Sequence, residues 1–307
     1  MKKKLIFLLL ICFYIFLSIT SCNSMAVSAE EYYLIGMAYF DLGRYEEAQI
    51  WLNRARQADK TMAASTYNLG RLAFEMKQYD EAVSYFEEIL IKDPDNILAL
   101  KAAAYTRIRT GDFLAADNHY KNLLRLIPES ADDGYNHALV LYAMERYGEV
   151  EITLERYPFS LLENRDIMLL YARSQKAQNK IEAIDSYASL LVLFSNPAAR
   201  YEYAQTLEYH EIYARAVEEY RQSHFEASAA DVNPDKSEIR FAISRALLIA
   251  DSESRDGITE LENAVEEGFK NIELIENLLN INNISLENSN SLRVIINNLR
   301  NPENPQS

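Results

Sequence analysis

The stretch AEEYYLIGMAYFDLGRYEEA at residues 29–48 returns 34 residues later as AASTYNLGRLAFEMKQYDEA at residues 63–82. Both stretches place Gly eighth, an aromatic residue seventeenth and Ala twentieth. Self-similarity at this period is typical of chains built from stacked helix pairs, because one pair alone cannot bury its apolar face. The stretch therefore predicts a helical repeat protein.

Each place in the repeat has a physical reason. Places 4, 7, 11, 24 and 27 follow helical spacing and predict the facing apolar stripes of two helices. Gly36 and Ala48 stand at places 8 and 20, where we expect the helices to cross closely. Gly or a polar residue at place 15, such as Gly43, ends the first helix, and the aromatic residue at place 17 fills the turn. Pro94, at place 32 of the second repeat, stops its second helix.

The repeats continue along the chain and become less regular. Further repeats start at Ile97, Ala131, Arg165 and Pro197, and a degenerate seventh starts near Glu238. We expect Pro158 to cut short the second helix of the fourth repeat, and the turn of the fifth repeat is one residue short. Outside the pattern we expect two more helices, around Ile272–Leu279 and Ser291–Leu299, and a loose tail at 301–307.

This pattern resembles the tetratricopeptide repeat (TPR) family, with Leu-Gly or a similar pair at places 7–8 and Pro at place 32. The resemblance covers residues 29–271. It implies an all-α fold, a right-handed superhelical α-solenoid of about seven helix-turn-helix units. Residues 272–300 then form a C-terminal helical cap, which a stack of repeats needs in order to end in a polar face.

The N-terminal segment predicts export and a lipid anchor. Three Lys residues precede an apolar run from Leu5 to Thr20, as in a signal peptide. A helix of that length spans roughly 24 Å, less than the ~30 Å hydrocarbon core. Ile19-Thr20-Ser21-Cys22 resembles the bacterial lipobox. The resemblance implies a lipoprotein signal peptide at 1–21, lipid such as palmitate on Cys22, and a short tether at 22–28.

These features predict a location in the cell envelope, facing the periplasm. Asn23 after the lipidated Cys favours the outer membrane over the inner one. The formal net charge is −15, and such an acidic chain repels phosphate backbones, so nucleic acid is excluded as a main partner. The two Cys residues, Cys12 and Cys22, give no disulfide framework.

No catalytic, cofactor or metal motif is found in the sequence. His137 stands at a packing place, and His210-Glu211 lacks the second His of a zinc-protease helix. Paired acids such as Glu87-Glu88 are interpreted as solvated helix faces. We therefore expect no enzyme activity, no catalytic residue, no metal and no cofactor.

The family resemblance implies that the first helix of each repeat lines a concave groove. Its groove-facing places hold the candidate peptide-binding residues Tyr33, Tyr67, Asn68, Arg71, Phe74, Lys101, Tyr105, Arg109, Tyr135, Tyr142 and Arg173. Lys176, Tyr201 and Gln205 stand at such places too. The central part is locally basic, which favours an acidic peptide along repeats two to five. The alternative is that solvent-facing places simply need amphipathic side chains. Of the carboxylate clamp found in one TPR subfamily, only Asn68 matches.

These observations predict a membrane-anchored scaffold that binds envelope proteins or peptides through its groove, and they are compatible with a homo-oligomer. A second hypothesis is an accessory lipoprotein of a solute-uptake system, which docks a substrate-binding protein or holds an apolar ligand.

Overall fold

The computed structural model describes residues 27–227 and 234–301 of the chain. Every regular element in these ranges is a helix, which confirms the predicted all-α repeat fold. The helices fall into two compact units that divide between Pro128 and Glu129. We call them the N-terminal unit and the C-terminal unit and describe each by itself.

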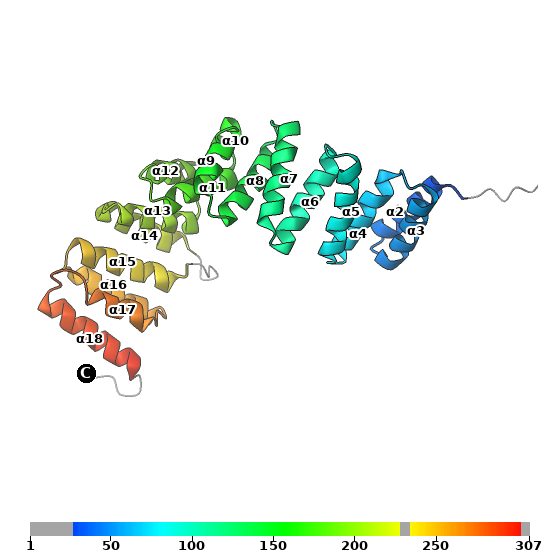
Figure 1. Ribbon diagram of the computed structural model, residues 1–307. Helices are drawn as coiled ribbons and strands as arrows, with labels where there is room; N and C mark the ends of the chain where they lie inside the picture. Colours follow the sequence, from blue (N-terminus) through cyan, green and yellow to red (C-terminus); the bar gives the residue numbers. More distant parts are fainter. Residues whose placement is uncertain (1–26, 228–233, 302–307) are drawn as a thin grey trace, which may run out of the picture. The chain divides into compact units, whose positions relative to one another are not determined.

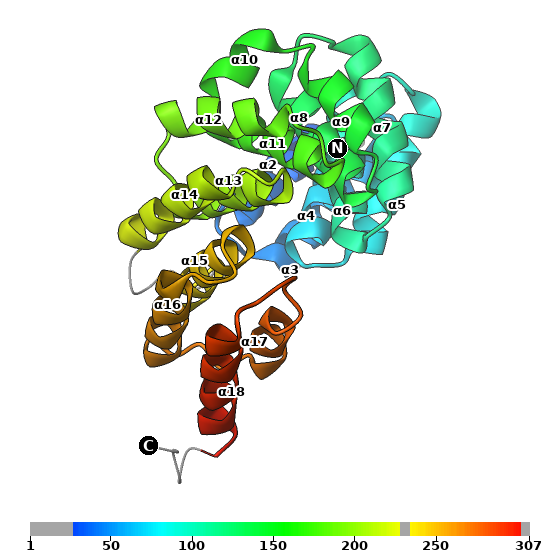
Figure 2. The same cartoon turned by 90° about the vertical axis from the view of Figure 1, so that its left-hand side faces the viewer.

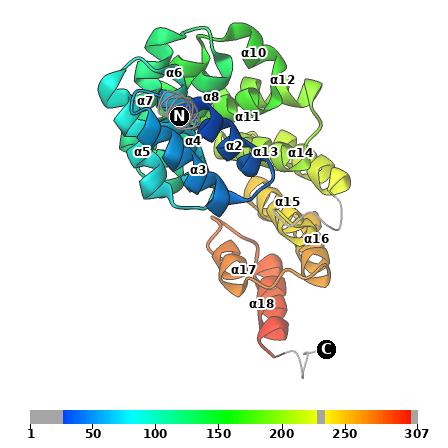
Figure 3. The same cartoon turned by 90° about the vertical axis from the view of Figure 1, so that its right-hand side faces the viewer.

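The N-terminal unit contains three helix hairpins, one for each of repeats one to three (Figure 1). Its helices are α2 (Ala29–Asp41), α3 (Tyr45–Ala58), α4 (Ala63–Glu75), α5 (Tyr79–Lys92), α6 (Ile97–Thr110) and α7 (Phe113–Leu126). Each helix packs on the next one in sequence, as Figure 3 shows for α2 and α3. The contacts of this unit are therefore local in sequence, as stacked repeats require.

The small residue at place 8 admits a large side chain from the second helix of the same hairpin. A Cβ on Gly36 would lie 2.8 Å from Cγ of Leu52, which stands at place 24 and is fully buried. Ala48 at place 20 is also fully buried. The predicted close crossing is thus present, and the nearest neighbour of place 8 is the side chain at place 24.

The turn inside each hairpin is built on one residue with left-handed backbone. In the first repeat this residue is Gly43, with φ of 70°, and in the second repeat it is Lys77, with φ of 61°. The equivalent residues of the later repeats, also with positive φ, are Gly111, Glu145, Asn179 and Glu211. All stand at place 15, where Gly or a polar residue was predicted to end the first helix.

The start of the first repeat is fixed by a capping box. The Ser28 hydroxyl accepts a hydrogen bond from the backbone N–H of Glu31, whose carboxylate accepts one from the backbone N–H of Ser28. Such reciprocal bonds satisfy donors that an open helix end leaves unpaired. In the same hairpin, the ring of Trp51 lies 5.8 Å from that of Tyr32, and the guanidinium of Arg54 lies 4.5 Å from the Trp51 ring.

The C-terminal unit holds the less regular repeats. Its helices are α8 (Ala131–Ala143), α9 (Tyr147–Leu154), α10 (Pro158–Glu163), α11 (Arg165–Ala177), α12 (Ala183–Leu193), α13 (Pro197–Tyr209), α14 (Tyr213–Glu226), α15 (Lys236–Ala250), α16 (Arg255–Glu266), α17 (Ile272–Leu278) and α18 (Leu286–Arg300). The second helix of the fourth repeat, α9, is short as predicted and ends at Leu154, four residues before Pro158. Pro158 itself opens the short helix α10, since Pro fits the first turn of a helix. This helix was not predicted.

The last two helices differ from the prediction in their bounds. α18 begins at Leu286, five residues before the predicted start at Ser291. Ser285 caps it by accepting a hydrogen bond from the N–H of Asn288, and the Asn288 amide donates to the carbonyl of Ser252 at 2.9 Å. α17 and α18 lie side by side (Figure 2) and contribute apolar side chains to one core with α16.

Three large tyrosines fill the core of repeats five and six. Tyr187, Tyr203 and Tyr220 are all at most 1% exposed. The Tyr187 hydroxyl donates to Glu202 at 2.9 Å, and the Tyr220 hydroxyl donates to Glu208 at 2.7 Å. Such an acceptor offsets the cost of burying a phenol, whereas the buried Tyr203 hydroxyl has no hydrogen-bond partner within the described residues. Within the described part of the chain, no helix combines the length and the apolar character needed to cross a bilayer.

Candidate functional site

The predicted groove residues are divided between the two units. Tyr135, Tyr142 and Arg173 belong to the C-terminal unit, and the other eight belong to the N-terminal unit. The predicted lipidation site, Cys22, lies outside the described residues. The two groups are described separately below.

Asn68 is the centre of the N-terminal group. It is 5% exposed on α4 and donates to the carbonyl of Ala64 at 2.9 Å and to the hydroxyl of Tyr33 at 3.1 Å. Its own carbonyl accepts from the guanidinium of Arg71 at 2.9 Å. The Arg71 guanidinium also lies 4.8 Å from the ring centre of Phe40, a cation–π contact. One buried amide thus fixes a tyrosine and an arginine of two repeats.

A cavity of about 400 Å³ lies beside this cluster. Tyr33, Asn68 and Arg71 supply polar groups to its wall, while Met37 and Leu98 supply apolar surface. Tyr67 lines it too and is half-buried against Phe86, with ring centres 5.6 Å apart. This volume falls in the range of small ligand pockets, roughly 300–1,000 Å³. It could accept an apolar or aromatic side chain of a peptide.

A second group of aromatic residues continues toward the third repeat. Phe74 contacts Tyr79 and Tyr105, with ring centres 5.3 and 5.4 Å away. Arg109 lies over the Tyr79 ring at 5.9 Å. Tyr105 is 52% exposed, so it combines a rigid aromatic surface with access from solvent. Lys101 is half-buried on the same helix.

In the C-terminal unit, Arg173 was expected to be a cation that is open to an acidic ligand. The structure shows instead that it is already paired. Its guanidinium makes a two-point ion pair with Glu202 at 2.8 and 2.6 Å. Burial raises the pKa of Glu202, but hydrogen bonds from Arg173 and Tyr187 overcome this and leave the pKa below its ordinary value. The charge of Arg173 is therefore already matched inside the unit.

Tyr135 and Tyr142 are half-buried and pack on the core formed by α8, α9 and α11. Tyr142 also faces a cavity of about 570 Å³ that Arg173, Lys176 and Tyr201 line with it. Both tyrosines thus support the fold, and Tyr142 is also accessible from a cavity.

Two acidic residues of this region were missed in the sequence. Glu202 and Glu208 stand at groove-facing places 6 and 12 of the sixth repeat, so the register contained the signal. Arg245, which pairs with Glu208 at 2.8 Å through two nitrogens, was missed for another reason. In the register of the degenerate seventh repeat it falls at place 8, where the pattern expects a small residue.

Metal binding has no support in the described ranges, 27–227 and 234–301. They contain no group of three or more His, Cys, Asp or Glu side chains arranged to hold an ion. His137 is 6% exposed, in agreement with the packing role predicted for it.

Comparison with known proteins identifies the class. Residues 28–90 match the sequence model of the tetratricopeptide repeat family. A tetratricopeptide repeat protein of Parabacteroides merdae has a similar structure, with a TM-score of 0.54 and 19% identity over 82% of this chain and 98% of that one. MamA of Desulfovibrio magneticus aligns with a TM-score of 0.50 and 16% identity, over 55% of this chain and 97% of that one. Residues 28–90 thus match tetratricopeptide repeats in sequence, and the fold is similar to that of a solved tetratricopeptide repeat protein over 82% of the chain.

Two curated relatives add little about activity. An uncharacterized lipoprotein of Treponema pallidum is 24% identical over 175 residues, which are 55% of this chain and 89% of the relative. The uncharacterized protein ycf37 of Guillardia theta is 28% identical over 101 residues, 31% of this chain and 57% of the relative.

Proposed function

We propose that the protein is a membrane-anchored scaffold of a bacterial envelope complex, which binds partner proteins or peptides through the groove-facing residues of its repeats. Lipid on Cys22 holds it in the envelope, facing the periplasm. The lipobox at residues 19–22 supports the anchor, and so does the name of the T. pallidum relative, which is called a lipoprotein.

The arrangement around Arg71 carries the binding part of the proposal. The side chain is exposed, and its guanidinium is held by Asn68 and by the ring of Phe40. Within the part of the chain that the structure describes, no carboxylate pairs with it. An oriented arginine without an acidic partner, beside an apolar cavity, suits an acidic peptide that also inserts a large side chain.

A capture experiment tests this function. The full-length lipidated chain is immobilised in detergent and incubated with solubilised envelope, and the bound proteins are identified by mass spectrometry. Arg71→Met keeps an apolar stem over Phe40 and removes the charge. It should lower the yield of the specific partners at least tenfold, because a charged hydrogen bond is lost at a hot-spot residue.

Arg54→Met is the matched control. Arg54 is also exposed and also stacks on an aromatic ring, but it lies on α3, the second helix of its hairpin. Its loss should leave capture unchanged. Equal capture by the parent and the Arg71 variant would contradict binding at this site.

A further inference from the structure

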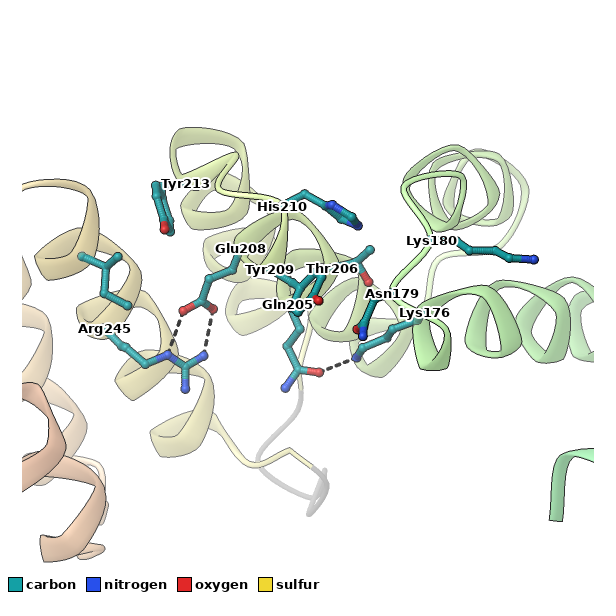
Figure 4. A pocket seen from close by; sticks show the side chains of 11 residues that line it. Lys176, Asn179, Lys180, Gln205, Thr206, Glu208, Tyr209, His210, Tyr213 and Arg245 are labelled. Atoms are coloured by element: carbon teal, nitrogen blue, oxygen red, sulfur yellow. Dashed lines mark hydrogen bonds and ion pairs between the residues drawn. The ribbon is translucent and has the colours of Figure 1, made fainter. Parts of the chain in front are cut away.

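Lys176 on α11 faces two adjoining cavities of the C-terminal unit. Their volumes are about 470 and 570 Å³, and both are lined by Lys176, Asn179 and Gln205. Figure 4 shows the smaller one, where α11, α13 and α15 contribute side chains. We call these two cavities together the Lys176 pocket. Its volume suits a small organic ligand.

The other cations of this pocket are matched by carboxylates. Arg245 pairs with Glu208, and Arg173 pairs with Glu202. Lys180 donates to Glu151 at 2.7 Å. The hydrogen-bonding partner of Lys176 is instead a neutral amide, because its ammonium donates to Oε1 of Gln205 at 2.6 Å. In the described part of the chain it makes no ion pair.

The surroundings of Lys176 favour an added negative charge. Desolvation lowers the pKa of Lys176; the charge of Glu202 works against this, and that of Arg173 adds to it. A partly buried ammonium that lacks an anionic partner is costly, so an anion that entered the pocket would relieve this cost. The Lys176 pocket as a whole also has more cationic than anionic side chains, although the net charge of the chain is −15.

Gln205 offers a second donor for the same anion. Its amide oxygen points toward Lys176, and its amide nitrogen points away from Lys176 (Figure 4). An anion that replaced the amide oxygen as the partner of the ammonium would let the Gln205 amide turn, so that its nitrogen donates to the second oxygen of the same carboxylate. Apolar surface for the rest of a ligand comes from Tyr209, Tyr213 and Ile249.

We propose that the Lys176 pocket binds the carboxylate of a ligand with an apolar body, with Lys176 as the ionic contact and Gln205 as the second donor. A free organic acid or an acidic side chain of a peptide can supply this group. Lys176 and Gln205 stand at groove-facing places, so the peptide form of this proposal rests on the proposed scaffold function. The site shares no residue with the Arg71 cluster, so each can fail without the other.

Calorimetric titration of the full-length chain in detergent tests the pocket. One arm uses 3-phenylpropionate and its neutral amide, and the other uses a hexapeptide with one central Glu and its Gln counterpart. In at least one arm the acid should bind and the neutral analogue should bind at least tenfold more weakly. The arm that binds identifies the source of the carboxylate.

Two variants separate binding from folding. Lys176→Met should weaken binding of the acid at least tenfold while helicity is kept. Gln205→Glu places a carboxylate beside Lys176 from within the chain, so it should abolish binding and keep or raise the thermal midpoint. Lys92→Met, which removes an exposed cation of the N-terminal unit, should bind as the parent does.

The proposal is overturned if neither acid binds, or if the neutral analogues bind as tightly as the acids. It is overturned as well if folded Lys176→Met and Gln205→Glu proteins bind as the parent does.

Discussion

Gly70 lies directly against the ring of Phe86. A Cβ on Gly70 would be 2.6 Å from Cε1 and 2.8 Å from Cζ of that ring, closer than real side chains approach. Phe86 is 1% exposed and belongs to the core that α4, α5 and α6 share. The absence of a side chain at Gly70 therefore allows α4 and α5 to approach this closely.

Replacing Gly70 by Leu should destabilise the fold by about 1–3 kcal/mol, because overpacking forces neighbouring side chains or backbone to move. A thermal melt followed by circular dichroism measures this. Gly148→Ala is the control, since the nearest atom to its Cβ would be the Gln178 amide oxygen at 3.7 Å. That change should be neutral or stabilising. An unchanged midpoint for Gly70→Leu would contradict the packing described.

The left-handed residues at place 15 give a reciprocal pair of predictions. Lys77 has φ of 61°, a conformation that costs a non-Gly residue about 1 kcal/mol or more. Lys77→Gly should therefore raise the free energy of unfolding by a net amount of roughly 0.5–1 kcal/mol, after the added backbone entropy of the unfolded chain is subtracted. A thermal melt should show this as a higher midpoint. Gly111→Ala, at the same place with φ of 77°, should lower the free energy of unfolding by about 1 kcal/mol and so lower the midpoint. Two shifts of the same sign would refute a shared turn geometry.

Glu202 should make the stability of the C-terminal unit depend on pH. Its pKa in the folded protein is lowered by Arg173 and Tyr187 despite burial. A carboxyl with a lowered folded-state pKa contributes stability above its unfolded-state pKa, and this contribution is lost as the pH falls through the folded-state value. The free energy of unfolding, measured by urea titration from pH 6 to pH 3, should fall less steeply for Glu202→Gln than for the parent. Glu218→Gln controls for the loss of one exposed acid. A slope unchanged in Glu202→Gln would argue against this linkage.

The lipid anchor is tested at Cys22. Cys22→Ala removes the thiol that the lipobox presents for modification, so the variant should take up no fatty-acid probe and should leave the membrane fraction. Metabolic labelling and fractionation measure both effects. Cys12→Ala, within the predicted signal peptide, should be labelled as the parent is. Equal labelling of the Cys22 variant would rule out this anchor.

The fold was predictable because its signals are local. Gly36, Gly70 and Ala82 each mark a close approach that recurs in one register, and the place-15 residues mark a turn that recurs with them. The start of α18 was not predictable in the same way. It depends on Ser285 and on an Asn288 amide that reaches the Ser252 carbonyl, a contact distant in sequence.

The candidate site was predictable in its positions and less so in its charges. Asn68 and Arg71 do lie together on α4, as their spacing requires. The sequence could not tell that Arg173 is matched by Glu202 whereas Lys176 meets the amide of Gln205. That difference depends on which side chains of α13 face α11, and a register gives the direction of a side chain without its partner.

The position of Trp51 in the first hairpin makes it an internal optical probe. It is the single tryptophan of the chain and contacts Tyr32 and Arg54 on α2 and α3. Tryptophan fluorescence will therefore report on the N-terminal unit alone. The buried Tyr187, Tyr203 and Tyr220 will contribute to the near-ultraviolet circular dichroism of the C-terminal unit. Recording both signals on one unmodified sample shows whether the two units lose their structure in a single cooperative transition or in two.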